Sequence, residues 1–315
     1  MIQLKKPKFW DKEKPNYLSF ILLPISKIVE QVGKLLSKKR AKINGIKSIC
    51  IGNIYIGGTG KTSLAIELKK FLDQLNIKSC FIKKYYKKQM DEIRLLKSHG
   101  ETFINNSRKK ALIEAKQKGY RVAILDDGLQ DKELLYDLSY LCFNKKNKIG
   151  NGLVIPAGPL RENINNIKYY DNVFLNGNNE DSSEFENFLL EKNKKIKFFY
   201  SNYVIKNLEN LKTQKSIFVF SGIGNHVTFV QMLKNNNFKI FNDTEFPDHY
   251  NYTDKDLKKI VNLAQEKNLD VFTTKKDFLR IDENKRNFIK YVDVKLEFKK
   301  NDEILNQLKK FNEIN

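Results

Sequence analysis

A glycine-rich segment near residue 57 has the residue types of a loop that binds phosphate. The segment follows an apolar run and consists of Gly57, Gly58, Thr59, Gly60, Lys61 and Thr62. Glycines let backbone N–H groups close around phosphate oxygens, and a helix beginning at Lys61 adds the positive end of its dipole. We expect Lys61 to reach the β- and γ-phosphates of a nucleotide and the Thr62 hydroxyl to bind Mg²⁺.

The segment departs from the usual G-x-x-x-x-G-K-[ST] spacing at one position. Tyr55 stands where that spacing places its first glycine. Gly57 and Gly58, two positions further on, can still provide a tight turn. The alternative is a glycine-rich turn that binds no nucleotide, but the strand expected before the segment and the helix expected after it favour the phosphate loop.

A second segment, Val122-Ala-Ile-Leu-Asp-Asp-Gly-Leu-Gln130, is an apolar run that ends in two acids. Asp126 stands at the strand end where a Walker B carboxylate holds Mg²⁺, directly or through water. Asp127 doubles the charge. Adjacent carboxylates repel unless a cation or a donor lies between them, so a metal-associated role is favoured over a plain turn.

Around these two segments the sequence alternates between short apolar runs and stretches of helical length. The expected strands are residues 48–51, 78–82, 121–125 and 138–143, and the expected helices are residues 61–75 and 107–119. This alternation predicts an α/β fold with right-handed crossovers. We therefore expect a P-loop NTPase-like, doubly wound, mostly parallel sheet with ligands at the carboxyl ends of its strands.

A second αβ series follows a polar, loop-like stretch over residues 176–184. Its expected strands are residues 216–220, 239–241 and 271–273, and its expected helices are residues 222–233, 254–265 and a last helix from residue 302. The sequence thus predicts a P-loop domain over residues 47–205. A smaller α/β domain over residues 206–315 is expected to close over the site.

Residues 1–46 differ in character from the rest of the chain. Pro15 and Pro24 punctuate an apolar run, after which apolar residues recur at helical spacing among lysines, as in Ile28, Val29, Val32, Leu35 and Leu36. The pattern predicts a basic amphipathic segment. It either lies in a membrane interface, with lysines toward anionic headgroups, or packs on the protein's own core, and the charge favours the membrane.

Composition limits the kinds of binding partner and the cellular location without identifying one partner. The formal net charge of +21 suits a polyanionic partner, although a general bias toward lysine explains it as well. Cys50, Cys80 and Cys142 lie singly in apolar runs, which predicts reduced, buried thiols and a cytoplasmic location.

Three further strings complete a pattern. They are Pro156-Ala-Gly-Pro-Leu-Arg-Glu162, Phe220-Ser-Gly-Ile-Gly-Asn225 and Phe246-Pro-Asp-His-Tyr-Asn-Tyr252. With the phosphate loop and the paired acids, in this order, they closely resemble the tetraacyldisaccharide 4'-kinase family, the membrane-associated kinases of lipid A biosynthesis. The resemblance covers the chain from about Ile49 to Asp277.

That resemblance implies an activity and a place. The activity is transfer of the ATP γ-phosphate, with Mg²⁺, to the 4'-hydroxyl of an acylated glucosamine disaccharide 1-phosphate, a lipid A precursor. The place is the cytoplasmic face of the inner membrane, with the protein bound peripherally. The resemblance leaves the oligomeric state open.

The resemblance also assigns roles to individual residues. Asp91 and Glu92, in Met90-Asp-Glu-Ile-Arg94, match a paired-acid string of the catalytic centre. We expect Asp91 to act as the base, His249 as its partner, Lys61 to stabilise the γ-phosphate and Glu92 to contact substrate. Arg161 is expected to bind phosphate or the anionic end of the substrate, or else to pair with an acid of the other domain. By residue type alone, Asp91 is typical of a solvated helix start and His249 of a structural turn.

Two rival classes have some support. Thr274-Lys-Lys-Asp277 after an apolar strand is typical of guanine recognition, which suggests a P-loop GTPase or metallochaperone, but Asp126-Asp-Gly128 is one residue too short for the D-x-x-G string that such a protein needs. The charge suggests a nucleic-acid-binding ATPase. Because the lysines are scattered rather than interleaved with aromatic residues, no nucleic acid is expected as a partner.

Overall fold

The computed structural model describes residues 6–35, 40–86, 89–177 and 181–313. Its contacts divide the chain into two compact units. We call the larger one the P-loop unit; it consists of residues 6–85, 99–202 and 296–315. The second unit contains residues 86–98 and 203–295. Each is described by itself.

The boundaries of these two units differ from those of the domains predicted from the sequence in three places. The described N-terminal residues belong to the P-loop unit instead of standing apart. Residues 296–315 also belong to it, because β12 (Val294–Phe298) joins its sheet and α10 (Asn301–Glu313) contacts α2 (Lys61–Gln74). Conversely α3 (Met90–Lys97) belongs to the second unit, where it contacts α9 (Lys275–Phe278).

The P-loop unit is built on an eight-stranded sheet in the order β12-β7-β6-β5-β1-β4-β2-β3. Parallel pairs join the strands from β7 to β3. The strands besides β12 are β1 (Lys47–Gly52), β2 (Ser79–Lys84), β3 (Thr102–Asn105), β4 (Val122–Asp126), β5 (Leu138–Asn144), β6 (Asn172–Asn176) and β7 (Lys197–Ile205).

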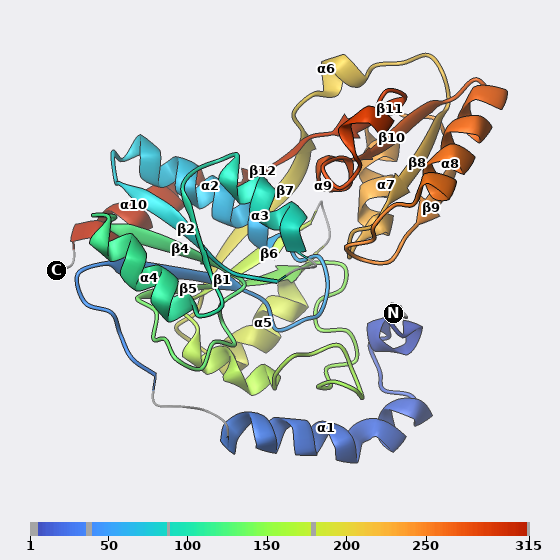
Figure 1. Cartoon of the computed structure of the whole chain (residues 1–315). Coiled ribbons are helices and arrows are strands. Elements are labelled where there is room, and N and C mark those ends of the chain that lie inside the picture. The colour runs from blue at the N-terminus through green and yellow to red at the C-terminus, as the bar shows by residue number, and fades with distance from the viewer. Residues whose placement is uncertain (1–5, 36–39, 87–88, 178–180, 314–315) are drawn as a thin grey trace. The chain divides into compact units, whose positions relative to one another are not determined.

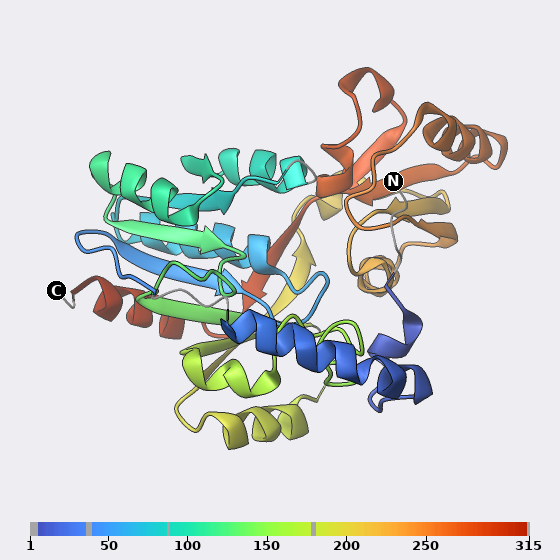
Figure 2. The same cartoon turned by 60° about the horizontal axis from the view of Figure 1, so that its bottom comes forward.

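Alternation along the strands gives this sheet two apolar faces. Leu141 of β5 packs in one cluster with α4 (Arg108–Gln117) and α5 (Ser183–Lys192). Its neighbour Tyr140 points the other way and bonds Gln307 of α10. One face therefore carries α4 and α5 (Figure 2 brings it forward), whereas the other carries α2 and α10. The α/β, doubly wound, mostly parallel sheet expected from the sequence is confirmed.

The second unit has its own parallel sheet in the order β11-β10-β8-β9. The strands are β8 (Ile217–Ser221), β9 (Ile240–Glu245), β10 (Asp270–Thr274) and β11 (Ile289–Val292). One face packs against α7 (His226–Asn235) and the other against α8 (Asp254–Glu266), which begins with a Thr253–Asp256 capping box. Short helical turns complete this unit at α6 (Leu208–Leu211) and η4 (Glu283–Lys285).

The N-terminal part of the P-loop unit is helical. After η1 (Lys8–Asp11), one continuous helix, α1 (Tyr17–Leu35), spans the apolar run (Figure 1). Pro24, which punctuates this run in the sequence, lies inside α1 on its exposed side, where water can satisfy the carbonyl that its ring leaves unbonded. Part of the basic stretch expected after the helix, residues 36–39, lies outside the described residues.

Small polar residues hold α1 against the rest of the unit. Ser26 donates to the carbonyl of Val154 at 2.8 Å and accepts from the N–H of Ala157 at 3.0 Å. The Asn151 amide donates to Ser19 at 3.1 Å. Seven apolar residues of α1 face away, each 44–71% exposed: Tyr17, Phe20, Ile21, Ile25, Ile28, Val29 and Val32. This stripe does not pack on the protein's own core.

None of the helices in the described part of the chain combines the length and the hydrophobicity needed to cross a bilayer. The three cysteines are free and buried, as expected.

Candidate active site

The glycine-rich segment forms a loop between β1 and α2. Gly57 and Gly60 have φ angles of 134° and 90°, in the left-handed region that glycine adopts readily. Gly60 is the N-cap of α2 and offers no side chain to the first N–H groups of the helix, so these donors remain available for an anion. Asn53 supports the loop by donating to the carbonyls of Tyr55 at 2.5 Å and Gly57 at 3.2 Å.

Tyr55, at the position of the missing glycine, has a structural role. Its backbone forms an antiparallel bridge with Leu160, and its ring is 1% exposed. The hydroxyl donates to Asp11 and accepts from Lys6 at 2.8 Å. Tyr55 therefore joins the N-terminal segment to the start of the phosphate loop.

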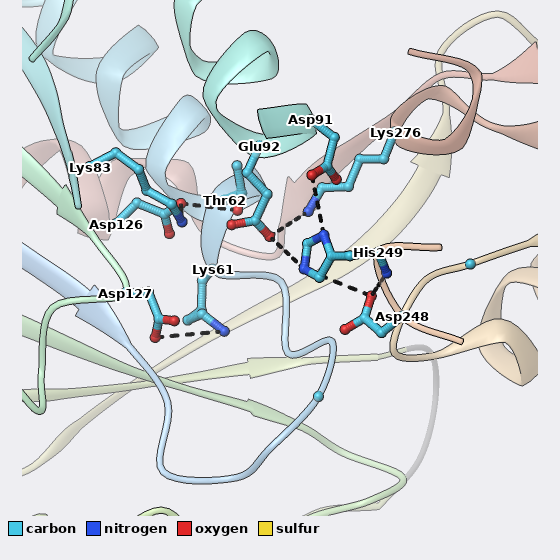
Figure 3. Close-up of polar contacts among 12 residues, drawn as sticks. Lys61, Thr62, Lys83, Asp91, Glu92, Asp126, Asp127, Asp248, His249 and Lys276 are labelled. Carbon is cyan, nitrogen blue, oxygen red and sulfur yellow. Dashed lines mark hydrogen bonds and ion pairs between the residues drawn. The ribbon is translucent and has the colours of Figure 1, made fainter. Parts of the chain in front are cut away.

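Asp126 closes β4 beside the first turn of α2. Its Oδ2 accepts from the Thr62 hydroxyl at 3.2 Å and from Lys83 at 2.8 Å (Figure 3). Its Oδ1 is buried and has no hydrogen-bond partner within the described residues. A hydroxyl and a carboxylate with a spare oxygen fit a hard cation that prefers oxygen ligands. This pair is not a cluster of acids or histidines, since nowhere in the described ranges do three His, Cys, Asp or Glu side chains form a group that could hold a metal ion.

Asp127 has different surroundings from its neighbour. It has a positive φ of 59°, which turns its side chain toward Arg161 at 2.7 Å and Lys61 at 3.9 Å. Burial alone would raise the pKa of this carboxyl, but the Lys61, Arg161 and Lys83 charges lower the pKa to about 2. Of the two acids expected to hold metal, only Asp126 bonds Thr62 within the described residues.

The segment from Pro156 to Glu162 pairs with the start of the phosphate loop through backbone hydrogen bonds. The Arg161 N–H donates to the carbonyl of Ile54 at 2.6 Å, and its guanidinium pairs with Asp127 of the same unit. Gln130 joins the two segments, since its amide donates to Glu162 at 2.8 Å and to the Asn53 carbonyl at 3.0 Å. Neither Gln130 nor Lys83 was singled out as a site residue from the sequence.

A second polar cluster lies entirely in the second unit. Asp91, in the first turn of α3, accepts from Nδ1 of His249 at 3.2 Å (Figure 3). His249 has a positive φ of 57°, and its backbone N–H donates to the Gly222 carbonyl at 3.0 Å. The structure thus unites Asp91 and His249, which are 158 positions apart in the sequence.

Glu92 belongs to the same cluster. Its Oε1 lies 4.0 Å from Nε2 of His249 and 3.1 Å from Nζ of Lys276. Asp248 also lies 4.0 Å from Nε2. The second ring nitrogen of His249 therefore faces carboxylates without being bonded to one at short range.

Arg280 completes the cluster and was not expected from the sequence. It donates to Oδ2 of Asp91 at 2.7 Å and to Asp277 at 2.8 Å. Burial opposes ionisation of Asp91, but the hydrogen bond from His249 and the charges of Arg280 and Lys276 hold the pKa of this carboxyl well below its usual value. The only sequence signal for Arg280 is its place shortly after the T-K-K-D string.

Asp277 itself argues against the guanine-recognition hypothesis. It is fully buried, and Oδ1 accepts from the N–H of Gly222 at 3.0 Å, from Tyr252 at 2.8 Å and from Arg280. Its Oδ2 accepts from Thr274 at 2.6 Å. This carboxylate is used to build the second unit and has no free edge for a base.

The chain is similar to known proteins over nearly its whole length. The family model described as tetraacyldisaccharide-1-P 4'-kinase matches residues 18–313. A tetraacyldisaccharide 4'-kinase of Pelagibacter ubique (strain HTCC1062) is 49% identical over 314 residues, covering 100% of both chains. That of Rickettsia bellii (strain OSU 85-389) is 34% identical over 319 residues, covering 94% of this chain and 95% of the relative.

A solved structure shares the fold. The crystal structure of LpxK from Aquifex aeolicus in complex with ATP matches with a TM-score of 0.70 and 23% identity, covering 93% of this chain and 99% of the other.

Proposed function

The chain belongs to the tetraacyldisaccharide-1-P 4'-kinase family, and from this premise we propose that it phosphorylates the 4'-hydroxyl of an acylated glucosamine disaccharide 1-phosphate, a lipid A precursor, with ATP as donor. The observation that carries the proposal is the phosphate loop. The helix after it, α2, begins with Lys61 and Thr62, and its N-cap Gly60 provides no side-chain cap. In the reaction, the acceptor oxygen bonds to the γ-phosphorus, the bond to the bridging oxygen of ADP breaks, and the hydroxyl proton leaves.

The P-loop unit supplies the nucleotide side of the reaction. The N–H groups around Gly58, Thr59 and Gly60 bind phosphate oxygens, and Lys61 neutralises charge that develops on the transferred group. Asp127 pairs with Arg161, and its carboxylate lies 3.9 Å from Nζ of Lys61. These contacts orient Lys61 and keep Arg161 close to the phosphates.

Mg²⁺ fits this site. Thr62 and Asp126 would hold it through a hydroxyl and the carboxylate oxygen that lacks a partner within the described residues. Bound there, Mg²⁺ would neutralise charge on the β- and γ-phosphates. Lys83 pairs with Oδ2 of Asp126 at 2.8 Å and holds this carboxylate in place.

The second unit supplies the acceptor side. A sugar hydroxyl must lose its proton as it attacks, and the Asp91–His249 pair combines a carboxylate and an imidazole in hydrogen-bond contact. Glu92, held by Lys276 at 3.1 Å, is placed to accept from a substrate hydroxyl. Arg161 is a further candidate for the anionic end of the substrate.

The exposed face of α1 suits a lipid substrate. Its apolar stripe of seven residues stands in solvent, and its small polar residues hold the helix to the loop that carries Arg161. A helix of this kind lies in the plane of a membrane interface. We therefore propose peripheral attachment to the cytoplasmic face of the inner membrane.

One assay tests the function. Purified protein, ATP and Mg²⁺ are incubated with a detergent-dispersed acyl disaccharide 1-phosphate, and the lipid is analysed by mass spectrometry. The expected product carries one more phosphate, located at the 4'-position by fragmentation. An unmodified lipid, from protein that is folded and binds ATP, would overturn the proposal.

A further inference from the structure

Resting on the nucleotide site of the proposed function, we propose that Lys83 is a built-in cation of the metal site, which lowers the affinity of that site for Mg²⁺ and raises its affinity for nucleotide phosphates. The proposed reaction uses Lys83 only to hold Asp126. Three features of the lysine support the larger role: its place in the sheet, its burial, and the carboxylate that it shares with Thr62.

Lys83 and Asp126 are neighbours in the sheet. In the parallel pair of β2 and β4, Lys83 lies opposite Asp126. Ile82 and Leu125, one position earlier in each strand, belong to the cluster on the face that carries α4 and α5. Because successive side chains of a strand point to opposite faces, Lys83 and Asp126 both point to the face covered by α2. The lysine is thus built into the part of the sheet from which the phosphate loop site is made.

The charged end of Lys83 is withdrawn from water. Its side chain is 1% exposed and that of Asp126 is 0% exposed, with Nζ of the lysine 2.8 Å from Oδ2 of the aspartate. Removing two charges from water is costly, and an apolar pair of similar volume is often as stable as a buried ion pair. Stability alone therefore does not account for an ion pair at this position.

The Asp126 carboxylate serves the lysine and the phosphate loop together (Figure 3). Its Oδ2 accepts from Lys83 and, at 3.2 Å, from the Thr62 hydroxyl, whereas Oδ1 has no partner within the described residues. Mg²⁺ held by Thr62 and Oδ1 would share with Lys83 a carboxylate whose charge the lysine already balances. Two cations at one carboxylate repel each other, so the lysine weakens metal binding.

The charge of Lys83 also reaches the rest of the phosphate loop cluster. Burial raises the pKa of Asp127, but the charges of Lys61 and Arg161 lower it to about 2, and the Lys83 charge contributes to the lowering. These three cations outnumber the carboxylates of Asp126 and Asp127, so this group of side chains carries a net positive charge. Without Lys83 the charges would cancel, and the attraction for phosphate oxygens would fall.

Two affinities should therefore move in opposite directions when the Lys83 charge is removed. Nucleotide without metal should bind more weakly, because Asp126 then repels phosphate oxygens without compensation. Metal should bind more tightly, because the charge of Asp126 is no longer balanced. A residue that only supported the fold would weaken both kinds of binding when replaced. The opposite signs thus distinguish a charge at the metal site from structural support.

The first test uses Lys83→Gln, which keeps a hydrogen-bond donor for Asp126 and removes the charge. Calorimetry in EDTA gives the affinity for metal-free ATP. Electron paramagnetic resonance gives the affinity for Mn²⁺ of the protein saturated with a non-hydrolysable ATP analogue. We expect ATP to bind about 10-fold more weakly and Mn²⁺ about 10-fold more tightly than in the wild type. Shifts that are not opposite in sign, in a folded variant, would overturn the inference.

Two further variants serve as controls. Lys83→Arg keeps the charge and should restore most of both affinities. Lys69 is a comparably shielded lysine of α2, 11% exposed and paired with Asp73 at 2.5 Å, but it lies about 12 Å along the helix from Lys61. Lys69→Gln should therefore change each affinity by less than about twofold. Shifts in Lys69→Gln as large as those in Lys83→Gln would show that total charge, instead of the position of Lys83, sets the affinities, and would overturn the inference.

A measurement on the wild type decides the question if Lys83→Gln does not fold. ¹⁵N NMR of lysine Nζ atoms reports the buried ammonium of Lys83, whose signal is assigned by its loss in Lys83→Arg. In protein saturated with the ATP analogue, we expect this signal to move when Mg²⁺ is added, and an unmoved signal would overturn the inference. No lipid phosphorylation by the wild type, with the opposite shifts in affinity present, would instead contradict the proposed function.

Discussion

The phosphate loop cluster and the His249 cluster use similar residues in different ways. Each contains a buried aspartate beside a cation, Asp126 with Lys83 at 2.8 Å and Asp91 with Arg280 at 2.7 Å. Asp126 keeps one oxygen without a partner within the described residues, whereas both oxygens of Asp91 are bonded. The first carboxylate is therefore suited to take a ligand, and the second to hold a neighbouring side chain.

The same comparison explains how the two clusters are encoded. The phosphate loop cluster comes from short strings at the carboxyl ends of adjacent parallel strands, β1 and β4. The His249 cluster joins α3 to segments more than 150 positions away. Local spacing identifies the first, while only the folded second unit assembles the other.

The largest effect is expected from Lys61→Ala. Loss of the charge that stabilises the transferred phosphoryl group should lower the rate of transfer about 1000-fold or more. Circular dichroism should show an unchanged fold. Lys70→Ala, on the exposed side of α2, is the control, and a Lys61→Ala protein with more than about a tenth of normal activity would break the assignment of this cluster.

Asp91→Asn should cost about 100-fold in turnover, because an amide does not supply the charge of the Asp91–His249 pair and leaves Arg280 with Asp277 as its remaining carboxylate partner. ATP affinity should change much less than turnover. Steady-state kinetics with calorimetric ATP binding measures both, and Asp254→Asn, an exposed acid paired with Lys285, serves as control. Full turnover in the variant would remove Asp91 from the mechanism.

Arg161→Leu probes the electrostatics of the phosphate loop cluster through stability. The folded pKa of Asp127 is about 2, below its ordinary value of 3.8, so its stabilisation is fully present above about pH 4 and is lost as pH falls through about 2. The variant should lose about 1–2 kcal/mol of unfolding free energy at pH 7, and less near pH 3.

Urea titrations at both pH values measure this difference. Arg121→Leu, at an exposed arginine of the same unit, controls for the loss of one positive charge. An equal loss at pH 7 and pH 3 would show that Arg161 acts through packing instead of through the Asp127 charge.

The smallest effect on nucleotide binding is expected from Tyr55→Phe. The substitution removes the hydroxyl that contacts Asp11 and Lys6 but keeps the buried ring. Proteolysis near residues 12–14 should become several-fold faster, while the Kd for ATP should change less than about twofold. Tyr17→Phe, at an exposed ring, should change neither. A loss of ATP affinity of about tenfold in Tyr55→Phe would mean that the hydroxyl supports the loop itself.

Much of the fold was predictable because its signals are local. The strands β1, β4 and β8 are short apolar runs followed by glycine or acid, and the expected helix over residues 254–265 is observed at Asp254–Glu266. The sequence analysis did not identify β6 and β7. Their residues mix Asn, Ser and Tyr with apolar side chains, and they become strands through pairing with β5 and with each other.

The site was also predictable only where its signals are local. Residues 57–62, Asp126 and Asp127 follow from known spacing, whereas Asp91 and His249 were found only through family resemblance. Lys83 and Arg280 give no signal of their own, since a buried lysine or arginine looks like any other until its acid partner is known. The division of residues 296–315 from the second unit likewise depends on contacts of β12 and α10 that no local pattern reveals.

The central claim is that one cluster binds the nucleotide and the other handles the acceptor proton. The most direct test measures equilibrium ATP binding and single-turnover transfer to the lipid in His249→Gln, beside the wild type. We predict ATP affinity within about twofold of the wild type and transfer at least about 100-fold slower. Loss of ATP binding in parallel with transfer, or transfer at the normal rate, would contradict this division of roles.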